Sequence, residues 1–172
     1  MLALRISPIT KVQIIVGLLF AGLAGSALAD AFERGSVGVT LGIGTGQVNN
    51  NDYYTVGLGV NYYVLNGLSL SLYGETRQGI EPTINKLSPG IGYVFSTRGP
   101  IKPYVGAFYR RTYVENFDDF DAYGGRAGVY LAMGGNAYLS IGGVYEKLHD
   151  CQDTATIKCS DAYGEIGLTF AF

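Results

Sequence analysis

The sequence contains no tryptophan, one histidine and two cysteines among its 172 residues. The two cysteines, Cys151 and Cys159, have no pair of histidines beside them, so the spacing that marks a zinc site is missing. Three nearby acids, Asp118, Asp119 and Asp121, could ligate a hard cation, but an acidic run of this kind is more typical of a solvated loop. We therefore predict no metal site and no cofactor.

Clusters of basic residues are also missing. Twelve Lys and Arg residues against fourteen Asp and Glu residues give a net charge of −2. A nucleic-acid binder needs a concentrated basic surface, so we expect no nucleic-acid partner. After Asp30, glycines or polar residues interrupt every apolar stretch, which excludes a further transmembrane helix of about 20 residues.

The first 29 residues have the features of a cleaved signal peptide. Arg5 and Lys11 precede an uncharged, mostly apolar stretch at residues 12–25, and Ala27-Leu28-Ala29 has the small-x-small pattern of a cleavage site. The apolar stretch is shorter than the ~20 residues of a retained transmembrane anchor. We predict export, removal of residues 1–29, and one domain formed by residues 30–172.

Glycine and tyrosine are abundant, with 26 and 14 residues. The repeat Gly42-x-Gly44-x-Gly46 follows an apolar alternating stretch but opens no helical pattern, so it is not a nucleotide-binding loop. Beyond residue 30, apolar residues alternate with small or polar residues, which is the period of a strand with one apolar face. Eight such strands are predicted, at residues 34–46, 53–64, 68–77, 84–96, 103–115, 122–132, 137–148 and 162–172.

The connections between these strands alternate in length. Asn66-Gly67, Arg98-Gly99 and Gly134-Gly135 mark tight turns, and the longer polar loops are predicted at residues 45–52, 78–83, 116–121 and 149–161. Strands of this length suit a tilted crossing of a bilayer. We therefore predict an all-β fold: an eight-stranded antiparallel up-and-down transmembrane β-barrel. Because such barrels have short periplasmic turns and longer external loops, both ends of the mature chain are expected in the periplasm.

The last strand carries the most specific signal. Ile166, Leu168, Phe170 and Phe172 alternate with small or polar residues and end on a terminal aromatic. This segment resembles the C-terminal strand of bacterial outer-membrane β-barrels. The chain from residue 34 onward resembles the small eight-stranded group that includes the transmembrane domain of outer membrane protein A and the opacity-type adhesins.

That resemblance implies a location and a set of partners. In the family, the C-terminal strand is an assembly signal read by the barrel-assembly machinery, here Ile166, Leu168, Phe170 and Phe172. The chain would be escorted by periplasmic chaperones and would lie in the Gram-negative outer membrane, against lipid and lipopolysaccharide.

Seven charged residues share the face opposite the apolar residues. They are Glu75, Arg77, Lys86, Arg110, Arg126, Glu146 and Glu165. Side chains fill the interior of an eight-stranded barrel, so we predict that these residues form a charge network in the lumen. A soluble, lipocalin-like barrel has the reverse polarity, with an apolar interior; the charged face, the terminal Phe and the unequal loops favour the membrane barrel.

Two further sites are predicted at the external side. Export permits a disulfide, and we predict one between Cys151 and Cys159 in the last external loop. Arg111 and Lys147 lie on the outward face near the external ends of their strands, where a charge costs little. Contact with lipopolysaccharide phosphates and snorkelling into water are both consistent with that position.

No catalytic residue is predicted. Lipid A deacylases are barrels of similar size that carry a His-x-Ser pair with a nearby acid. Here His149 precedes Cys151 at the corresponding spacing, and Ser160 and Glu165 depart from the family pattern. We therefore predict a non-enzymatic outer-membrane protein with a structural or surface-interaction role. A narrow channel or transport facilitator is the alternative, and a lipid A-modifying enzyme is a less favoured one.

Overall fold

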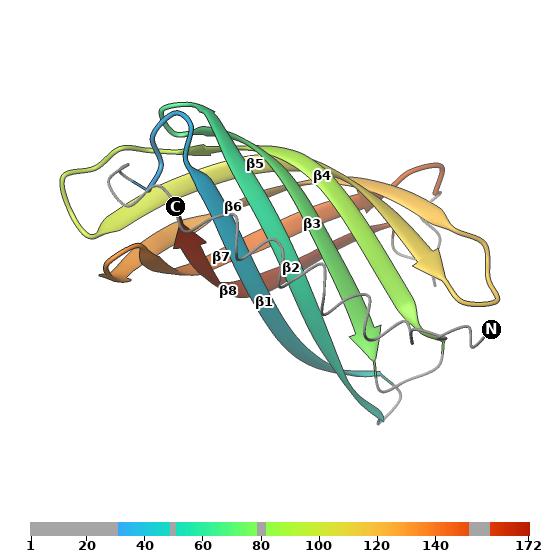
Figure 1. Cartoon of the computed structure of the whole chain (residues 1–172). Helices are drawn as coiled ribbons and strands as arrows, with labels where there is room; N and C mark the ends of the chain where they lie inside the picture. The colour runs from blue at the N-terminus through green and yellow to red at the C-terminus, as the bar shows by residue number, and fades with distance from the viewer. Residues whose placement is uncertain (1–30, 49–50, 79–81, 152–158) are drawn as a thin grey trace, which may run out of the picture.

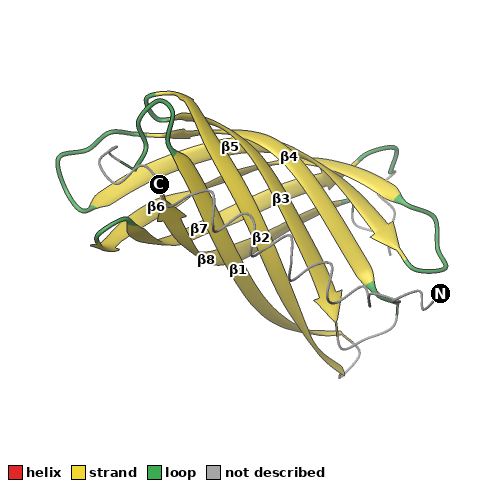
Figure 2. Cartoon of the chain, viewed as in Figure 1, coloured by secondary structure: helices red, strands yellow, loops and turns green. Residues whose placement is uncertain are grey.

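The computed structural model of the chain describes residues 31–48, 51–78, 82–151 and 159–172, and the predicted signal peptide lies outside these ranges. The described residues form a closed antiparallel barrel whose eight strands follow one another in sequence order (Figures 1 and 2). The strands are β1 (Val37–Val48), β2 (Asn51–Leu65), β3 (Leu68–Gln78), β4 (Ile84–Val94), β5 (Ile101–Val114), β6 (Phe120–Gly134), β7 (Ala137–Leu148) and β8 (Ser160–Ala171). The predicted all-β, eight-stranded antiparallel up-and-down barrel is confirmed.

Several strand boundaries differ from the prediction, by up to three residues. Residues 34–36 precede β1, because the chain turns there to enter the end of the barrel. Most of the predicted loop at residues 45–52 belongs to β1 and β2, which remain paired up to Val48 and Asn51. Phe120 and Asp121 likewise belong to β6. Backbone hydrogen bonds extend these hairpins beyond the last alternating apolar side chain, which is why the sequence pattern ends earlier than the strands.

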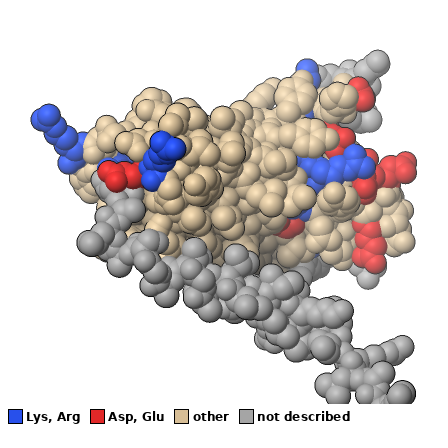
Figure 3. Space-filling view, turned by 45° about the horizontal axis from the view of Figure 1, so that its top comes forward, with Lys and Arg blue, Asp and Glu red and all other residues tan. Residues whose placement is uncertain are grey.

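The barrel has two unlike ends. The end that carries the three connections at residues 66–67, 95–100 and 135–136, together with Phe172, is here called the turn end. The opposite end carries the four connections at residues 49–50, 79–83, 115–119 and 149–159 and is called the loop end. Figure 3 shows Lys, Arg, Asp and Glu gathered at the two ends, with a band free of them between.

Side chains alternate between the two surfaces of the wall as the sequence predicts. The outward surface exposes large apolar side chains, which include Leu58, Leu70, Leu72, Ile91, Val105 and Ile141. Tyr63, Tyr104, Phe108 and Tyr138 face inward and are buried. Among the described residues, no helix is long and apolar enough to span a membrane.

Pro89 interrupts one ladder without changing its register. It stays paired with Leu72 of β3, but pairing of β4 with β5 skips from Leu87 to Gly90. A proline has no N–H to donate to a ladder, so the pairing is interrupted locally while the register on either side is unchanged.

Inward glycines make room for inward tyrosines. The ring of Tyr73 lies across Gly42, Gly57 and Gly59, and a Cβ atom at Gly57 would be 1.9 Å from the Tyr73 hydroxyl oxygen. Tyr104 occupies the same kind of space beside Gly128 and Gly142. The high glycine content is therefore explained in part by aromatic side chains that fill a narrow interior.

This packing predicts the effect of adding one methyl group. We expect Gly57→Ala to lower the free energy of unfolding by about 1–3 kcal/mol, because Tyr73 has to move within a filled interior. In the matched control Gly74→Ala, the added Cβ meets only the Leu58 carbonyl oxygen, at 3.9 Å. Urea unfolding of the refolded barrel, followed by gel mobility, measures both. Equal midpoints for the two variants would contradict the packing argument.

Candidate functional site

The loop-end half of the lumen is lined by charged side chains. A cavity of about 330 Å³ lies there, and all seven residues of the predicted charge network line it. Six strands contribute to this set, β3 to β8. The period-two pattern therefore identified the inward face of each strand, and closure of the barrel brings these faces together.

Arg110 is the centre of this network. Its side chain is only 3% exposed, and its Nε donates a hydrogen bond to the Ser88 hydroxyl at 3.0 Å. One terminal nitrogen donates to the Tyr163 hydroxyl at 2.6 Å and also forms an ion pair with Glu146. Three strands besides its own thus hold the guanidinium, so Arg110 ties β4, β7 and β8 to β5.

Two further ion pairs belong to the network. Lys86 Nζ lies 3.1 Å from a carboxylate oxygen of Glu75, its register partner across β3 and β4. Arg126 lies 3.5 Å from Glu165, which also accepts a hydrogen bond from the Tyr104 hydroxyl at 2.9 Å. Arg77 lines the same cavity.

The middle of the lumen is lined by hydroxyl and aromatic groups. The Thr40 and Thr169 hydroxyls are hydrogen-bonded at 2.8 Å, and the Ser140 hydroxyl donates to the Gly167 carbonyl oxygen at 3.0 Å. The remaining space is a cavity of about 100 Å³, whose lining includes Tyr73 and Phe108. The interior is therefore polar at this level but narrow.

An aromatic cluster closes the turn end. Its centre is Phe32, whose ring centroid lies 5.6 Å from that of Tyr63, 5.3 Å from that of Tyr130 and 4.8 Å from that of Tyr138. The Phe32 carbonyl oxygen accepts a hydrogen bond from the Gly67 N–H at 2.8 Å, which fixes the segment before β1 against the β2–β3 turn. The cluster therefore fills the lumen at this end.

Sequence reasoning missed Phe32. The residue stands before the first alternating stretch, so periodicity assigned it no role. The one available signal was a large aromatic side chain three residues beyond the predicted cleavage site.

Arg111 and Lys147 lie on the outward surface at the loop end. The Arg111 guanidinium bonds to Asp121 at 3.0 Å and to Asp119 at 3.2 Å, so two carboxylates already balance its charge. Lys147 is exposed beside its register partners Tyr123 and Ser160. Contact of either residue with lipopolysaccharide stays a prediction, and Lys147 is the better placed of the two.

The residues weighed as metal ligands or catalytic groups are placed differently. In the described part of the chain, no group of three or more His, Cys, Asp or Glu residues is arranged to hold a metal ion. His149 is exposed, with its Nδ1 2.8 Å from Asp150. Glu165 faces the lumen, where it contacts Arg126 and Tyr104, so it is engaged away from His149.

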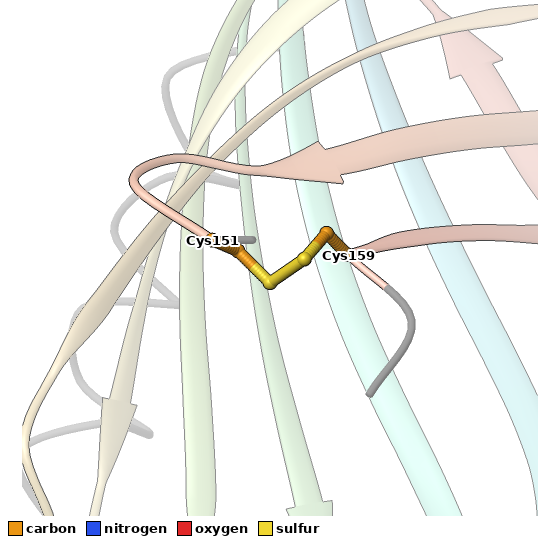
Figure 4. Close-up of a disulfide and its surroundings, with 2 residues drawn as sticks. All are labelled: Cys151 and Cys159. Atoms are coloured by element: carbon orange, nitrogen blue, oxygen red, sulfur yellow. A yellow bond between two sulfur atoms is a disulfide. The ribbon is translucent and has the colours of Figure 1, made fainter. Parts of the chain in front are cut away.

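Cys151 and Cys159 form a disulfide in the structure, with Cα atoms 5.6 Å apart (Figure 4). Cys151 follows β7 and Cys159 precedes β8. The bond therefore joins the two ends of the longest connection close to the strands, and residues 152–158 between them lie outside the described ranges.

The disulfide leads to a prediction about the state of the two thiols in the folded protein. Alkylation of native membranes without a reductant, followed by mass spectrometry, should find no free thiol. We expect Cys151→Ser with Cys159→Ser to lower the free energy of unfolding by about 2–3 kcal/mol, because the unfolded chain regains the entropy of a short loop. Two alkylated cysteines in native membranes would contradict the predicted bond.

The four residues of the predicted assembly signal lie in or directly after β8. Leu168 pairs with Leu41 of β1 and Leu139 of β7, so this half of β8 closes the barrel. Phe172 extends the closure, because its N–H donates to the Val37 carbonyl oxygen and its carbonyl oxygen accepts from the Val37 N–H, at 2.8 and 2.9 Å.

No protein-family model and no curated protein matches this sequence. Solved structures share its fold. The chain is similar to the N-terminal β-barrel domain of Pseudomonas aeruginosa OprF, with 18% identity over 81% of this chain and 98% of that chain and a TM-score of 0.56. For Neisserial surface protein A the identity is 17%, the coverage 79% and 94%, and the TM-score 0.53.

A de novo designed transmembrane β-barrel is similar to the same degree, with 18% identity, coverage of 81% and 98%, and a TM-score of 0.54. At these identities, the comparisons establish a shared fold: that of the small eight-stranded transmembrane barrels.

Proposed function

We propose that this chain, which has the fold of the small eight-stranded outer-membrane barrels, is an integral outer-membrane protein with a structural or surface-interaction role and a closed lumen. One observation carries the proposal: the cluster around Phe32 fills the lumen at its turn end, and three ion pairs of the described residues cross the loop-end half. A barrel closed in this way holds its shape without offering a continuous aqueous path.

The proposed location rests on the outward surface. Large apolar side chains are exposed there, and the band without charges lies between two charged ends (Figure 3). This arrangement suits a bilayer, in which a closed barrel satisfies its backbone hydrogen bonds within the wall. Residues 1–29 are then the cleaved signal peptide, the turn end and both mature termini are periplasmic, and the loop end faces outward.

The partners follow from that location. Periplasmic chaperones and the barrel-assembly machinery would act on the unfolded chain, with Ile166, Leu168, Phe170 and Phe172 as the assembly signal. Lipid and lipopolysaccharide would surround the folded barrel, and the loop end would present the surface for any further partner.

Two assays separate this function from its alternatives. Proteoliposomes containing the refolded barrel should take up small sugars no faster than empty liposomes, whereas a transport facilitator would accelerate uptake. Mass spectrometry of lipid A from cells expressing the protein should find the acyl chains unchanged. Accelerated uptake would contradict the proposal and support the channel hypothesis. Altered acyl chains would contradict it and support the hypothesis of a lipid A-modifying enzyme.

A further inference from the structure

The wall of the barrel is interrupted at the loop end between β1 and β8. Beyond the Val37–Phe172 hydrogen bonds at the turn end, the described residues of these strands pair over Gly38 to Gly42 of β1, whereas β1 stays paired with β2 up to Val48 and β8 stays paired with β7 back to Ser160. Within the described ranges, the loop-end halves of β1 and β8 therefore have a ladder on one side only. Figure 1 shows the two strands adjacent near the C-terminus and diverging away from it.

The charged cavity reaches this interruption. Its lining residues from β2 to β7 all have inward parity, and the three outward residues that line it are Ile43, Gly164 and Ile166. Outward positions of β1 and β8 border an interior cavity here because the wall is open between these strands. Ile43 and Ile166 are 74% and 61% exposed, so the polar interior and the apolar outer surface meet at this seam.

Glycines lie where the pairing stops. Gly42 and Gly167 form the last β1–β8 pair, and Gly44 and Gly46 of β1 and Gly164 of β8 lie beyond it, along the interruption. Glycine weakens a strand and often marks a close approach of another group. In a bilayer, unpaired backbone groups are costly unless something polar covers them, so the seam requires an occupant that is polar on the inside and apolar on the outside.

We propose that the seam between β1 and β8 binds a single-chain amphiphile with an anionic head group. The head lies in the charged cavity beside Arg126, and the hydrocarbon tail passes between Ile43 and Ile166 into the surrounding lipid. A cavity of about 330 Å³ suits a head group rather than a whole lipid. Because the ladder is missing between one pair of strands alone, the gap suits one hydrocarbon chain.

Arg126 is better placed than Arg110 to receive the head group, because its partner Glu165 belongs to β8, one of the two strands that border the seam. Arg110 is 3% exposed and held by Ser88, Glu146 and Tyr163. In contrast, the Arg126 side chain is 26% exposed, and its ion pair with Glu165, at 3.5 Å, is the longest of the three in the lumen. An anion beside Arg126 therefore competes only with the long ion pair to Glu165, whereas an anion beside Arg110 would have to displace several shorter contacts.

The inference rests on the proposed membrane location but not on the closed lumen. The test uses the full mature barrel in phosphatidylcholine nanodiscs, with hexadecanoate as the probe and nuclear magnetic resonance as the readout. We expect saturable shifts of the Arg126 Nε–H signal and of the Ile43 and Ile166 methyl signals, while the methyl signals of Ile91, on the fully paired part of β4, stay unchanged. Equal shifts at all outward isoleucines would mean partition into the bilayer alone and would overturn the proposal.

Matched variants test the place of the tail. Gly164→Trp narrows the seam and should weaken hexadecanoate binding by about tenfold or more. Gly143→Trp is its control, because Gly143 is the register partner of Gly164 on β7 and a Cβ at either position meets a single carbonyl oxygen at 3.9 Å. Wild-type affinity in Gly164→Trp would contradict the proposed path.

Probes with different head groups test whether the site requires a negative charge, without the use of any variant. Hexadecyltrimethylammonium, with the same tail and the opposite charge, should leave the Arg126 signal unshifted. Lysophosphatidylglycerol and hexadecanoate should both shift it, and the tighter of the two identifies a phosphate or a carboxylate as the preferred head. A failure of all anionic probes would reject the amphiphile site while leaving uptake by proteoliposomes, and with it the proposed closed barrel, unaffected.

Discussion

Arg110→Ala is expected to destabilise the barrel more than any other single replacement in the lumen. The substitution leaves Glu146 without its ion-pair partner and removes the hydrogen bonds to Ser88 and Tyr163. Removing one member of a buried ion pair typically costs about 3–5 kcal/mol, because the other charge is left uncompensated. We expect the urea midpoint of unfolding to fall accordingly, and Glu146→Ala to have an effect in the same direction.

The adjacent residue provides the control. Arg111 has the same side chain and two carboxylate partners, but it lies on the outward surface with 41% of its side chain exposed. Exposed ion pairs contribute little to stability because water screens the charges, so Arg111→Ala should leave the midpoint nearly unchanged. Equal losses in the two variants would show that the inward position of Arg110 is not what makes its contacts important.

Deletion of Phe172 is expected to lower the amount of folded barrel in outer-membrane fractions several-fold. The closure between β1 and β8 is short, and the deletion removes the two backbone hydrogen bonds between Phe172 and Val37 that extend it. It also removes the terminal aromatic ring of the predicted assembly signal. Heat-modifiable gel mobility, compared between wild type and variant at equal expression, measures the folded fraction.

A second variant separates the ring from the backbone. Phe172→Gly keeps the backbone groups that bond to Val37 but lacks the ring. If the ring acts as the signal, Phe172→Gly should assemble as poorly as the deletion, whereas refolding of the two in detergent should differ. A wild-type folded yield for the deletion would contradict both roles of Phe172.

The sequence predicted the wall of the barrel well because the wall is a local pattern. The alternation placed Glu75 and Lys86 on the inward face of neighbouring strands, and the register of β3 against β4 places them directly opposite each other. It could not pair Arg110 with Glu146, because that contact crosses from β5 to β7 and depends on how the closed barrel is sheared.

Features at the barrel ends were harder to predict for a different reason. Phe32 lies in a segment too short to have a period, and its position depends on a lumen that exists only after closure. The seam lies between the first and the last strand, β1 and β8, which are far apart in the sequence. No local pattern therefore predicts where their pairing stops.

The closed lumen is the central claim, and the current through a single barrel tests it most directly. The refolded mature protein, inserted into a planar lipid bilayer in potassium chloride, should show no steady conductance above the bare membrane, because the cluster around Phe32 fills the turn end of the lumen and the ion pairs around Arg110 cross its loop-end half. Uniform, voltage-independent current steps from the wild-type barrel would contradict the claim and identify the protein as a channel.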